Sequence, residues 1–219
     1  LPPALIEMPP RGVVNLHGGR IPDYRGCAPI PWQILRGETT LGLTVLYADA
    51  GIDTGDVLAE ETYELAPEEG ATEAVARTLE RFPVMLVNVL RGLEAGTLQG
   101  RPQDLSAGAY YTRRHPEDGA IDCRLQTAEE IFHLIRALRS PYPGAFAWRG
   151  NEKIVLQRAR LLEETVIGVP GHVPLKRPDG VVLCAQDRGL LVTEVREGET
   201  VVPARDRLRT GDRLRPASA

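Results

Sequence analysis

Apolar residues form two kinds of pattern along the first part of the chain, short continuous runs and a helical spacing. Residues 12–17 and 41–48 are short apolar runs that end in Gly, Pro and Asp, which predicts two buried strands of a parallel sheet. Residues 31–38 begin with a proline and predict a short helix. Apolar residues at helical spacing fill 72–91, where Pro83 predicts a kink or a break. The pattern therefore favours an α/β arrangement for this part of the chain.

After residue 92 the helical period is lost. Residues 93–109 are polar and rich in glycine, which is typical of a linker. Thr127 and Glu130 form a capping box ahead of an amphipathic helix. Short strands between Gly and Pro turns then predict a small barrel or sandwich, and they cover 153–159, 180–186 and 189–195. We expect an α/β domain over 1–92, a linker over 93–109, and a helix with a small β domain over 110–219.

The composition is that of an ordinary globular protein, with 42% hydrophobic and 26% charged residues. A net charge of -4 argues against a broad basic surface that wraps nucleic acid, but leaves a local basic patch open. The end of the chain is the candidate for such a patch, although a solvated strand edge is the simpler interpretation. Its basic residues are Arg205, Arg207, Arg209, Arg213 and Arg215.

The three cysteines lie far apart and form neither a zinc-ligand spacing nor a plausible disulfide framework. No apolar run approaches the roughly 20 residues that a membrane-spanning helix requires, and no signal peptide is recognisable. We therefore expect a cytoplasmic protein with no metal site and no membrane span.

Two polar residues end the first predicted strand. Asn15 and His17 are two positions apart, so their side chains point to the same face. Ligands of open parallel sheets gather beyond the carboxyl ends of the strands, where we expect both residues. Asp53 follows the second strand and could reach His17 if the two strands are near neighbours in one parallel sheet. The simpler alternatives are a hydrogen-bonded core histidine and an aspartate that organises a glycine turn.

Asn, His and Asp side chains in one place can carry out acyl transfer to an amine. Asn15 and a protonated His17 would donate hydrogen bonds to the developing oxyanion. Asp53 would orient the imidazole and help to remove the proton of the amine. This chemistry requires no Ser or Cys nucleophile, and Cys27 has no base at a readable spacing.

Four motifs follow one another over residues 15–58: N-x-H, P-x-Y-R-G, G-E-x-x-x-G-x-T and G-I-D-T-G-D. In this order and spacing they closely resemble the formyltransferase family that uses 10-formyltetrahydrofolate. The resemblance continues through the segments YYTRRHPEDGAIDC and IRALRSPYPGAF. It implies a partial Rossmann-like formyltransferase domain followed by a small OB-like β subdomain, with 10-formyltetrahydrofolate as the formyl donor.

The resemblance also implies roles for individual residues. The catalytic residues would be Asn15, His17 and Asp53, which orient the formyl group and manage protons. The loop after the second strand would line the pterin end of the folate, through Asp49, Ala50, Gly51, Ile52 and Thr54. Arg25 and Trp32 would face the amine substrate.

The chain departs from the family pattern in two respects. Members normally carry roughly ninety residues before the N-x-H motif, which supply the first strands of the Rossmann-like sheet. We therefore expect a fragment or a processed chain, whose open sheet edges would favour a partner or a homo-oligomer. Cys123 stands where relatives usually have a tryptophan.

The formyl acceptor is the remaining question. The HGG sequence that contains His17 and the SPYPGAF segment resemble the enzymes that act on nucleotide-linked amino sugars, such as UDP-4-amino-4-deoxy-L-arabinose. We therefore expect a nucleotide-sugar acceptor. Methionyl-tRNA is the alternative, which the arginine-rich end of the chain supports because OB-like domains bind nucleic acid. An inactive truncated relative or a binding module is a further alternative.

Overall fold

The computed structural model describes residues 2–216, which form two compact units. The first unit contains the chain up to Pro67 together with Glu73–Arg114. The second contains Glu68–Thr72 and the chain from His115 onward. The domain boundaries expected from the sequence, with a linker over 93–109, stay a prediction.

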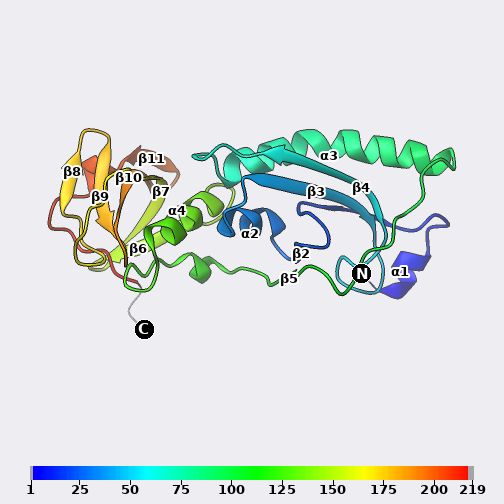
Figure 1. The fold of residues 1–219 in the computed structure, drawn as a ribbon, viewed down its shortest axis with the longest axis horizontal. Coiled ribbons are helices and arrows are strands. Elements are labelled where there is room, and N and C mark those ends of the chain that lie inside the picture. Colours follow the sequence, from blue (N-terminus) through cyan, green and yellow to red (C-terminus); the bar gives the residue numbers. More distant parts are fainter. Residues whose placement is uncertain (1, 217–219) are drawn as a thin grey trace. The chain divides into compact units, whose positions relative to one another are not determined.

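The first unit combines a long helix, α3 (Ala71–Glu94), with shorter helices and strands (Figure 1). In chain order its elements are α1 (Pro3–Glu7), β1 (Val14–His17), β2 (Arg25–Gly26), α2 (Pro29–Leu35), β3 (Thr40–Tyr47), β4 (Val57–Glu64), most of α3 (Ala71–Glu94) and β5 (Tyr110–Tyr111). The mixed α/β class agrees with the expectation from the sequence.

The main sheet of this unit has the strand order β1-β3-β4, and both pairs are antiparallel. Val14 pairs with Tyr47 and His17 pairs with Thr44, so the prediction of two parallel strands is wrong. The apolar content of a strand reports its burial and not the direction of its neighbour. Strand β3 is buried along both faces, as predicted. Strand β1 is an edge strand among the described residues, and its Leu16 is 37% exposed.

Helix α3 covers the sheet on the side of β4 (Figure 1). The hydroxyl of Tyr63 in β4 donates to the Ala74 carbonyl of this helix at 3.1 Å. The helix continues through Pro83, so of the two predicted outcomes the break is wrong, and the kink stays a prediction. The proline ring removes one backbone N–H. Because Leu79, one turn earlier, is 68% exposed, water can reach the carbonyl that loses its partner. Strand β4 was not predicted, because its exposed glutamates mask the apolar positions.

The second unit is a small β domain with one main helix (Figure 1). Its elements are η1 (Pro116–Gly119), α4 (Ala128–Ala137), β6 (Ala145–Arg149), β7 (Glu152–Leu161), β8 (Leu175–Arg177), β9 (Gly180–Cys184), β10 (Gly189–Glu197), β11 (Thr200–Pro203) and α5 (Ala204–Arg207). The sheet has the order β6-β7-β10-β9-β8, with β11 on β10, and all of its pairs are antiparallel. The predicted strands over 153–159, 180–186 and 189–195 are confirmed.

Helix α4 begins as the sequence predicts. The Thr127 hydroxyl accepts from the Glu130 N–H at 3.2 Å, and the Thr127 N–H donates to the Glu130 carboxylate at 2.8 Å. This capping box satisfies two backbone donors that a helix start otherwise leaves unpaired. The apolar face of α4 packs against β7, where Ile131, Ile135 and Leu156 are almost fully buried. None of the described helices is both long and apolar enough to cross a membrane.

Candidate active site

The carboxylate of Asp53 lies at the centre of a polar cluster in the first unit. Asn15 Nδ2 donates to Asp53 Oδ1 at 3.2 Å. The backbone N–H of Gly26 donates to Oδ2 at 2.8 Å, and His17 Nδ1 lies 3.5 Å from the same oxygen. The structure therefore brings Asn15, His17 and Asp53 together, although the strands run antiparallel. Their contact is possible because the loop after β3 returns alongside β1, whose residues Asn15 and His17 point to one face.

His17 is held at both ring nitrogens. Its side chain is 6% exposed, and Nε2 lies 2.6 Å from the carbonyl oxygen of Tyr24. The Asp53 carboxylate faces the other nitrogen. His17 can therefore donate Nε2–H to a substrate only after it exchanges the Tyr24 carbonyl for that substrate.

The loop that carries Asp53 is built by short-range hydrogen bonds. Asp49 Oδ1 accepts from the Gly51 N–H at 3.0 Å and from the Thr54 hydroxyl at 2.7 Å. A Cβ atom on Gly51 would overlap Thr54 Oγ1, so this turn requires glycine. Asp53 itself has a φ of 54°, in the left-handed region that few residues other than Gly, Asn and Asp adopt. The loop therefore holds the carboxylate in one direction at a local conformational cost.

A cavity of about 340 Å³ opens beside this cluster. Asn15 and Asp53 lie in its wall, whereas His17 is not part of the lining. The remaining wall comes from β1, from the end of β3 and from the following loop, with Val13, Val14, Leu46, Tyr47, Ala48, Asp49, Gly51 and Ile52. Ile52 is 64% exposed, so the loop presents an apolar side chain to solvent at the rim. The predicted folate contacts through Asp49, Ala50, Gly51, Ile52 and Thr54 stay a prediction.

Arg25, the first predicted substrate-binding residue, is buried in a hydrogen-bond network. Its side chain is 1% exposed, and its guanidinium donates to Gln103 Oε1 at 3.0 Å. Further bonds reach the carbonyl oxygens of Ala107 at 2.9 Å and Asp104 at 3.1 Å. These bonds give Arg25 a structural role in holding the segment after α3. Binding of the amine substrate would require this network to open, and this predicted role stays a prediction.

Trp32, the second predicted substrate-binding residue, is half-buried in an aromatic cluster. Its Nε1 donates to the Thr112 carbonyl at 3.0 Å, and its ring lies 5.2 Å from that of Tyr111. The guanidinium of Arg114 lies 4.9 Å from the Trp32 ring. Its contact with an amine substrate also stays a prediction.

Two contacts of the site escaped the sequence analysis. The N–H of Gly26 is a backbone group, so no side-chain pattern could reveal that it binds Asp53. Gln103 donates through Nε2 to the carbonyl oxygens of Asp53 and Gly55 at 2.9 and 2.6 Å. Gln103 lies fifty residues beyond Asp53 in a segment that we expected to be a linker, and no pattern in that segment singles it out.

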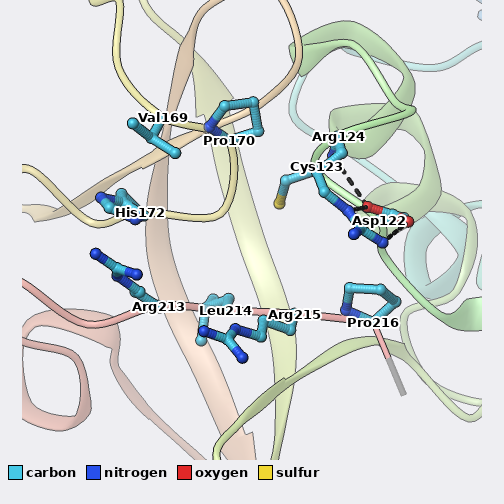
Figure 2. Close-up of a pocket in the computed structure, with 10 residues that line it drawn as sticks. All are labelled: Asp122, Cys123, Arg124, Val169, Pro170, His172, Arg213, Leu214, Arg215 and Pro216. Carbon is cyan, nitrogen blue, oxygen red and sulfur yellow. Dashed lines mark hydrogen bonds and ion pairs between the residues drawn. The ribbon is translucent and has the colours of Figure 1, made fainter. Parts of the chain in front are cut away.

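The second unit has a cavity of about 510 Å³ with a basic rim (Figure 2). Arg213 and Arg215 are exposed on either side of the buried Leu214, and both line this cavity. No hydrogen bond or ion pair of their side chains is present within residues 2–216. Arg124 is paired with Asp122 at 2.8 Å, and this hydrogen bond lowers the pKa of the Asp122 carboxyl. Among residues 2–216, this cavity therefore offers two arginine side chains that no carboxylate pairs.

The three cysteines differ in burial and therefore in reactivity. Cys123 points into this cavity (Figure 2). Burial raises the pKa of Cys123 to about 12, and burial also raises the pKa of Cys184. Both therefore stay protonated and poorly nucleophilic at neutral pH, whereas Cys27 is exposed.

We expect a thiol reagent at pH 7.5 to label Cys27 in the native protein and all three cysteines in denaturant, as counted by mass spectrometry. The Cys27→Ser variant should lose native labelling, and rapid native labelling of Cys123 would contradict its burial.

Within the described part of the chain, no group of His, Cys, Asp and Glu side chains could hold a metal ion. The cluster around Asp53 is therefore an assembly of hydrogen-bonding groups. An amide, an imidazole and a carboxylate beside a cavity can orient a carbonyl group and stabilise charge that develops on its oxygen.

Comparison with known proteins identifies the same chemistry in both parts of the chain. A family model described as formyl transferase matches residues 1–90, and a model of the formyl transferase C-terminal domain matches residues 114–210. A methionyl-tRNA formyltransferase of Solibacter usitatus is 38% identical over 216 residues, which are 98% of this chain and 68% of that protein. Curated relatives that are 31% to 34% identical carry the same name.

Solved structures share the fold of this chain. A variant of HypX from Aquifex aeolicus has a TM-score of 0.66 and 25% identity, over 87% of this chain and 35% of HypX. An N-formyltransferase from Helicobacter canadensis, solved with folinic acid and dTDP-3-aminofucose, has a TM-score of 0.65 and 19% identity, over 82% of this chain and 65% of that one. The chain spans about two thirds of the length of its curated relatives. It belongs to the formyl transferase family.

Proposed function

We propose that this protein transfers the formyl group of 10-formyltetrahydrofolate to the amino group of methionyl-tRNA. The observation that carries the choice of acceptor is the 38% identity to a methionyl-tRNA formyltransferase over 98% of the chain. The HGG and SPYPGAF segments favour a nucleotide-linked amino sugar instead, with methionyl-tRNA as the alternative. The sugar formyltransferases among the structural neighbours are 18% to 19% identical, so their likeness supports the fold alone.

The cluster around Asp53 supplies the groups that this reaction needs. Asn15 lines the cavity, where its amide can donate to the oxygen of a formyl group that gains negative charge. Asp53 holds the Asn15 amide and faces the His17 ring, so it fixes both donors before the substrate arrives. His17 supplies a second donor once its Nε2 leaves the Tyr24 carbonyl. Asp53 then lies where a carboxylate can assist in removing the proton of the attacking amine.

The cavity beside the cluster suits the formyl donor. Bound 10-formyltetrahydrofolate supplies an activated formyl group. The donor carries a flat ring system with polar edges, and the cavity wall combines apolar side chains of β1 and β3 with the backbone of the Asp53 loop. Backbone N–H and C=O groups of a loop held by Asp49 can pair with such edges, while Val14 and the exposed Ile52 offer apolar surface to the ring faces. The residues present therefore fit the donor.

The basic rim of the second unit supports a polynucleotide acceptor. The chain as a whole is acidic, but this acidic excess lies in residues 1–114, and basic and acidic residues almost balance in 115–219. Arg213 and Arg215 follow one another at a spacing of two, which places both side chains on one face of an extended segment. This segment pairs with His172 and with Trp148. Unpaired arginines on an OB-like domain are typical phosphate ligands.

Replacing Arg213 and Arg215 together by alanine should weaken the use of tRNA. When phosphate contacts are lost, tRNA binding releases fewer counterions from the tRNA. We therefore expect KM for methionyl-tRNA to rise about 10-fold, with a shallower salt dependence and an unchanged kcat. The measurement is the steady-state kinetics of formylation between 50 and 200 mM salt. Arg11→Ala with Arg36→Ala removes the same charge from exposed positions of the first unit and serves as the control. An unchanged KM in the Arg213 and Arg215 variant would exclude this surface from tRNA binding.

A competition experiment tests the proposed acceptor. The purified chain is given 10-formyltetrahydrofolate with initiator methionyl-tRNA and UDP-4-amino-4-deoxy-L-arabinose in one reaction, and mass spectrometry identifies the products. We expect formylmethionyl-tRNA and no formylated sugar. A formylated sugar alone would overturn the acceptor and leave formyl transfer intact. The absence of both products would overturn formyl transfer by this chain.

A further inference from the structure

The geometry points to Gln103 as a positioning residue for the carboxylate of Asp53. We infer that its side chain holds the backbone of the Asp53 loop, and that Arg25 in turn fixes the orientation of its amide. This inference rests on the proposed role of Asp53 in formyl transfer, and it is carried by a chain of hydrogen bonds that runs from a buried arginine to the centre of the site.

The first step concerns the loop. Gln103 Nε2 donates to the carbonyl oxygen of Asp53 at 2.9 Å and to that of Gly55 at 2.6 Å. Asp53 has a φ of 54°, a conformation that an L residue keeps only when its surroundings impose it. The amide of Gln103 lies at the peptide group that follows this angle. It therefore opposes relaxation of the loop toward an ordinary conformation.

The second step concerns the direction of the amide. Arg25 has only donors, so the group that accepts from its Nε must be the oxygen of the Gln103 amide. The NH₂ group then has to face the two carbonyl groups of the loop. Arg25 is itself fixed by its bonds to the carbonyl oxygens of Asp104 and Ala107 and is almost completely buried. The arginine therefore allows Gln103 one amide orientation.

The third step links the hydrogen bonds of Gln103 to the loop backbone, here called the tether, to the Asp53 carboxylate. Arg25 and Gly26 are consecutive residues of β2, and the N–H of Gly26 donates to Asp53 Oδ2 at 2.8 Å. Asp53 thus accepts a hydrogen bond from Gly26 at its side chain and one from Gln103 at its backbone. Both bonds depend on β2, because Gly26 belongs to it and Arg25 of the same strand orients Gln103. Loss of the backbone hold leaves the carboxylate free to turn away from Asn15 and His17. A shift of this kind, of about 1 Å, can cost about 10²-fold in rate.

The test compares Gln103→Leu with Gln99→Leu, a matched control at an exposed position of the same segment. Leucine keeps the bulk of glutamine and removes its donors. We expect Gln103→Leu to lower kcat by about 10- to 100-fold, with KM for both substrates within about threefold of the parent. The Gln99 variant should retain the parent kinetics. A residue that acts only on stability would lower the melting temperature and leave the kcat of the folded fraction unchanged, and that result would overturn the inference.

A double-variant cycle separates an action through Asp53 from an independent effect. In an Asp53→Asn background the carboxylate is absent, so Gln103→Leu should change the residual kcat by less than about threefold. An equal loss of kcat in both backgrounds would contradict positioning through Asp53.

Hydrogen exchange provides a readout that needs no turnover. Gln103→Leu should increase exchange of the amides in residues 49–56, and Gln99→Leu should not. If the parent protein transfers no formyl group, the proposed function fails, and the exchange data still decide whether Gln103 holds the loop. Unchanged exchange in residues 49–56 would show that the tether does not exist.

Discussion

Replacing Asp53 by asparagine is expected to lower the rate of formyl transfer by about 10²- to 10⁴-fold. The carboxylate accepts from Asn15 through one oxygen and from Gly26 through the other, and it faces His17. An amide has a single acceptor oxygen, so in either orientation its NH₂ group faces a donor. The charge beside the His17 ring is lost as well. The measurement is kcat with saturating 10-formyltetrahydrofolate and acceptor.

Asp56→Asn is the matched control for this variant. Asp56 lies in the same loop, and its side chain makes no hydrogen bond or ion pair within residues 2–216. Asparagine also accepts the left-handed backbone of position 53, so the fold should survive in both variants, as checked by circular dichroism and melting temperature. An Asp53→Asn enzyme within about threefold of the parent rate would exclude the carboxylate from the reaction.

Replacing His17 is expected to produce the second large loss, of about 10²- to 10⁴-fold in kcat for alanine. The side chain has two separable roles: it holds the Tyr24 carbonyl at 2.6 Å, and it can supply a proton-bearing donor to the substrate. Glutamine can donate an amide N–H to this carbonyl but cannot take up and release a proton as an imidazole can. We therefore expect His17→Gln to keep the parent melting temperature and KM more closely than His17→Ala, with a kcat that stays low.

The two His17 variants test the mechanism from opposite sides. Near-normal turnover in His17→Gln would limit His17 to holding the chain at Tyr24. Near-normal turnover in His17→Ala would remove His17 from the mechanism altogether. A lower melting temperature for the alanine variant alone is expected, because that substitution leaves the buried Tyr24 carbonyl without its partner.

Two features could be predicted from local rules. Alternation along a strand puts Asn15 and His17 on one face. The capping box of α4 is local in the same sense, since Thr127 and Glu130 are three residues apart. Asp53 lies 38 residues beyond Asn15, so its place beside both residues was expected from the family resemblance and not from a local pattern.

Features that depend on distant partners were not predictable. The antiparallel pairing of β1 with β3 follows from the path of the connection between them, which the apolar pattern does not encode. The burial of Arg25 depends on carbonyl groups about eighty residues farther along the chain. A charged side chain at a loop edge suggests a ligand contact, and only the fold reveals that its donors are already used.

The left-handed backbone of Asp53 has a consequence for how such enzymes can lose their activity. A φ of 54° costs Asn and Asp less than it costs the other residues except Gly, so most substitutions at this position disrupt the loop itself. Asparagine keeps the loop and removes the charge. An aspartate codon becomes an asparagine codon by a single base change. Some gene copies lose activity while their protein stays folded. We therefore expect these copies to carry asparagine at this position, so the codon at position 53 would identify them in genome surveys.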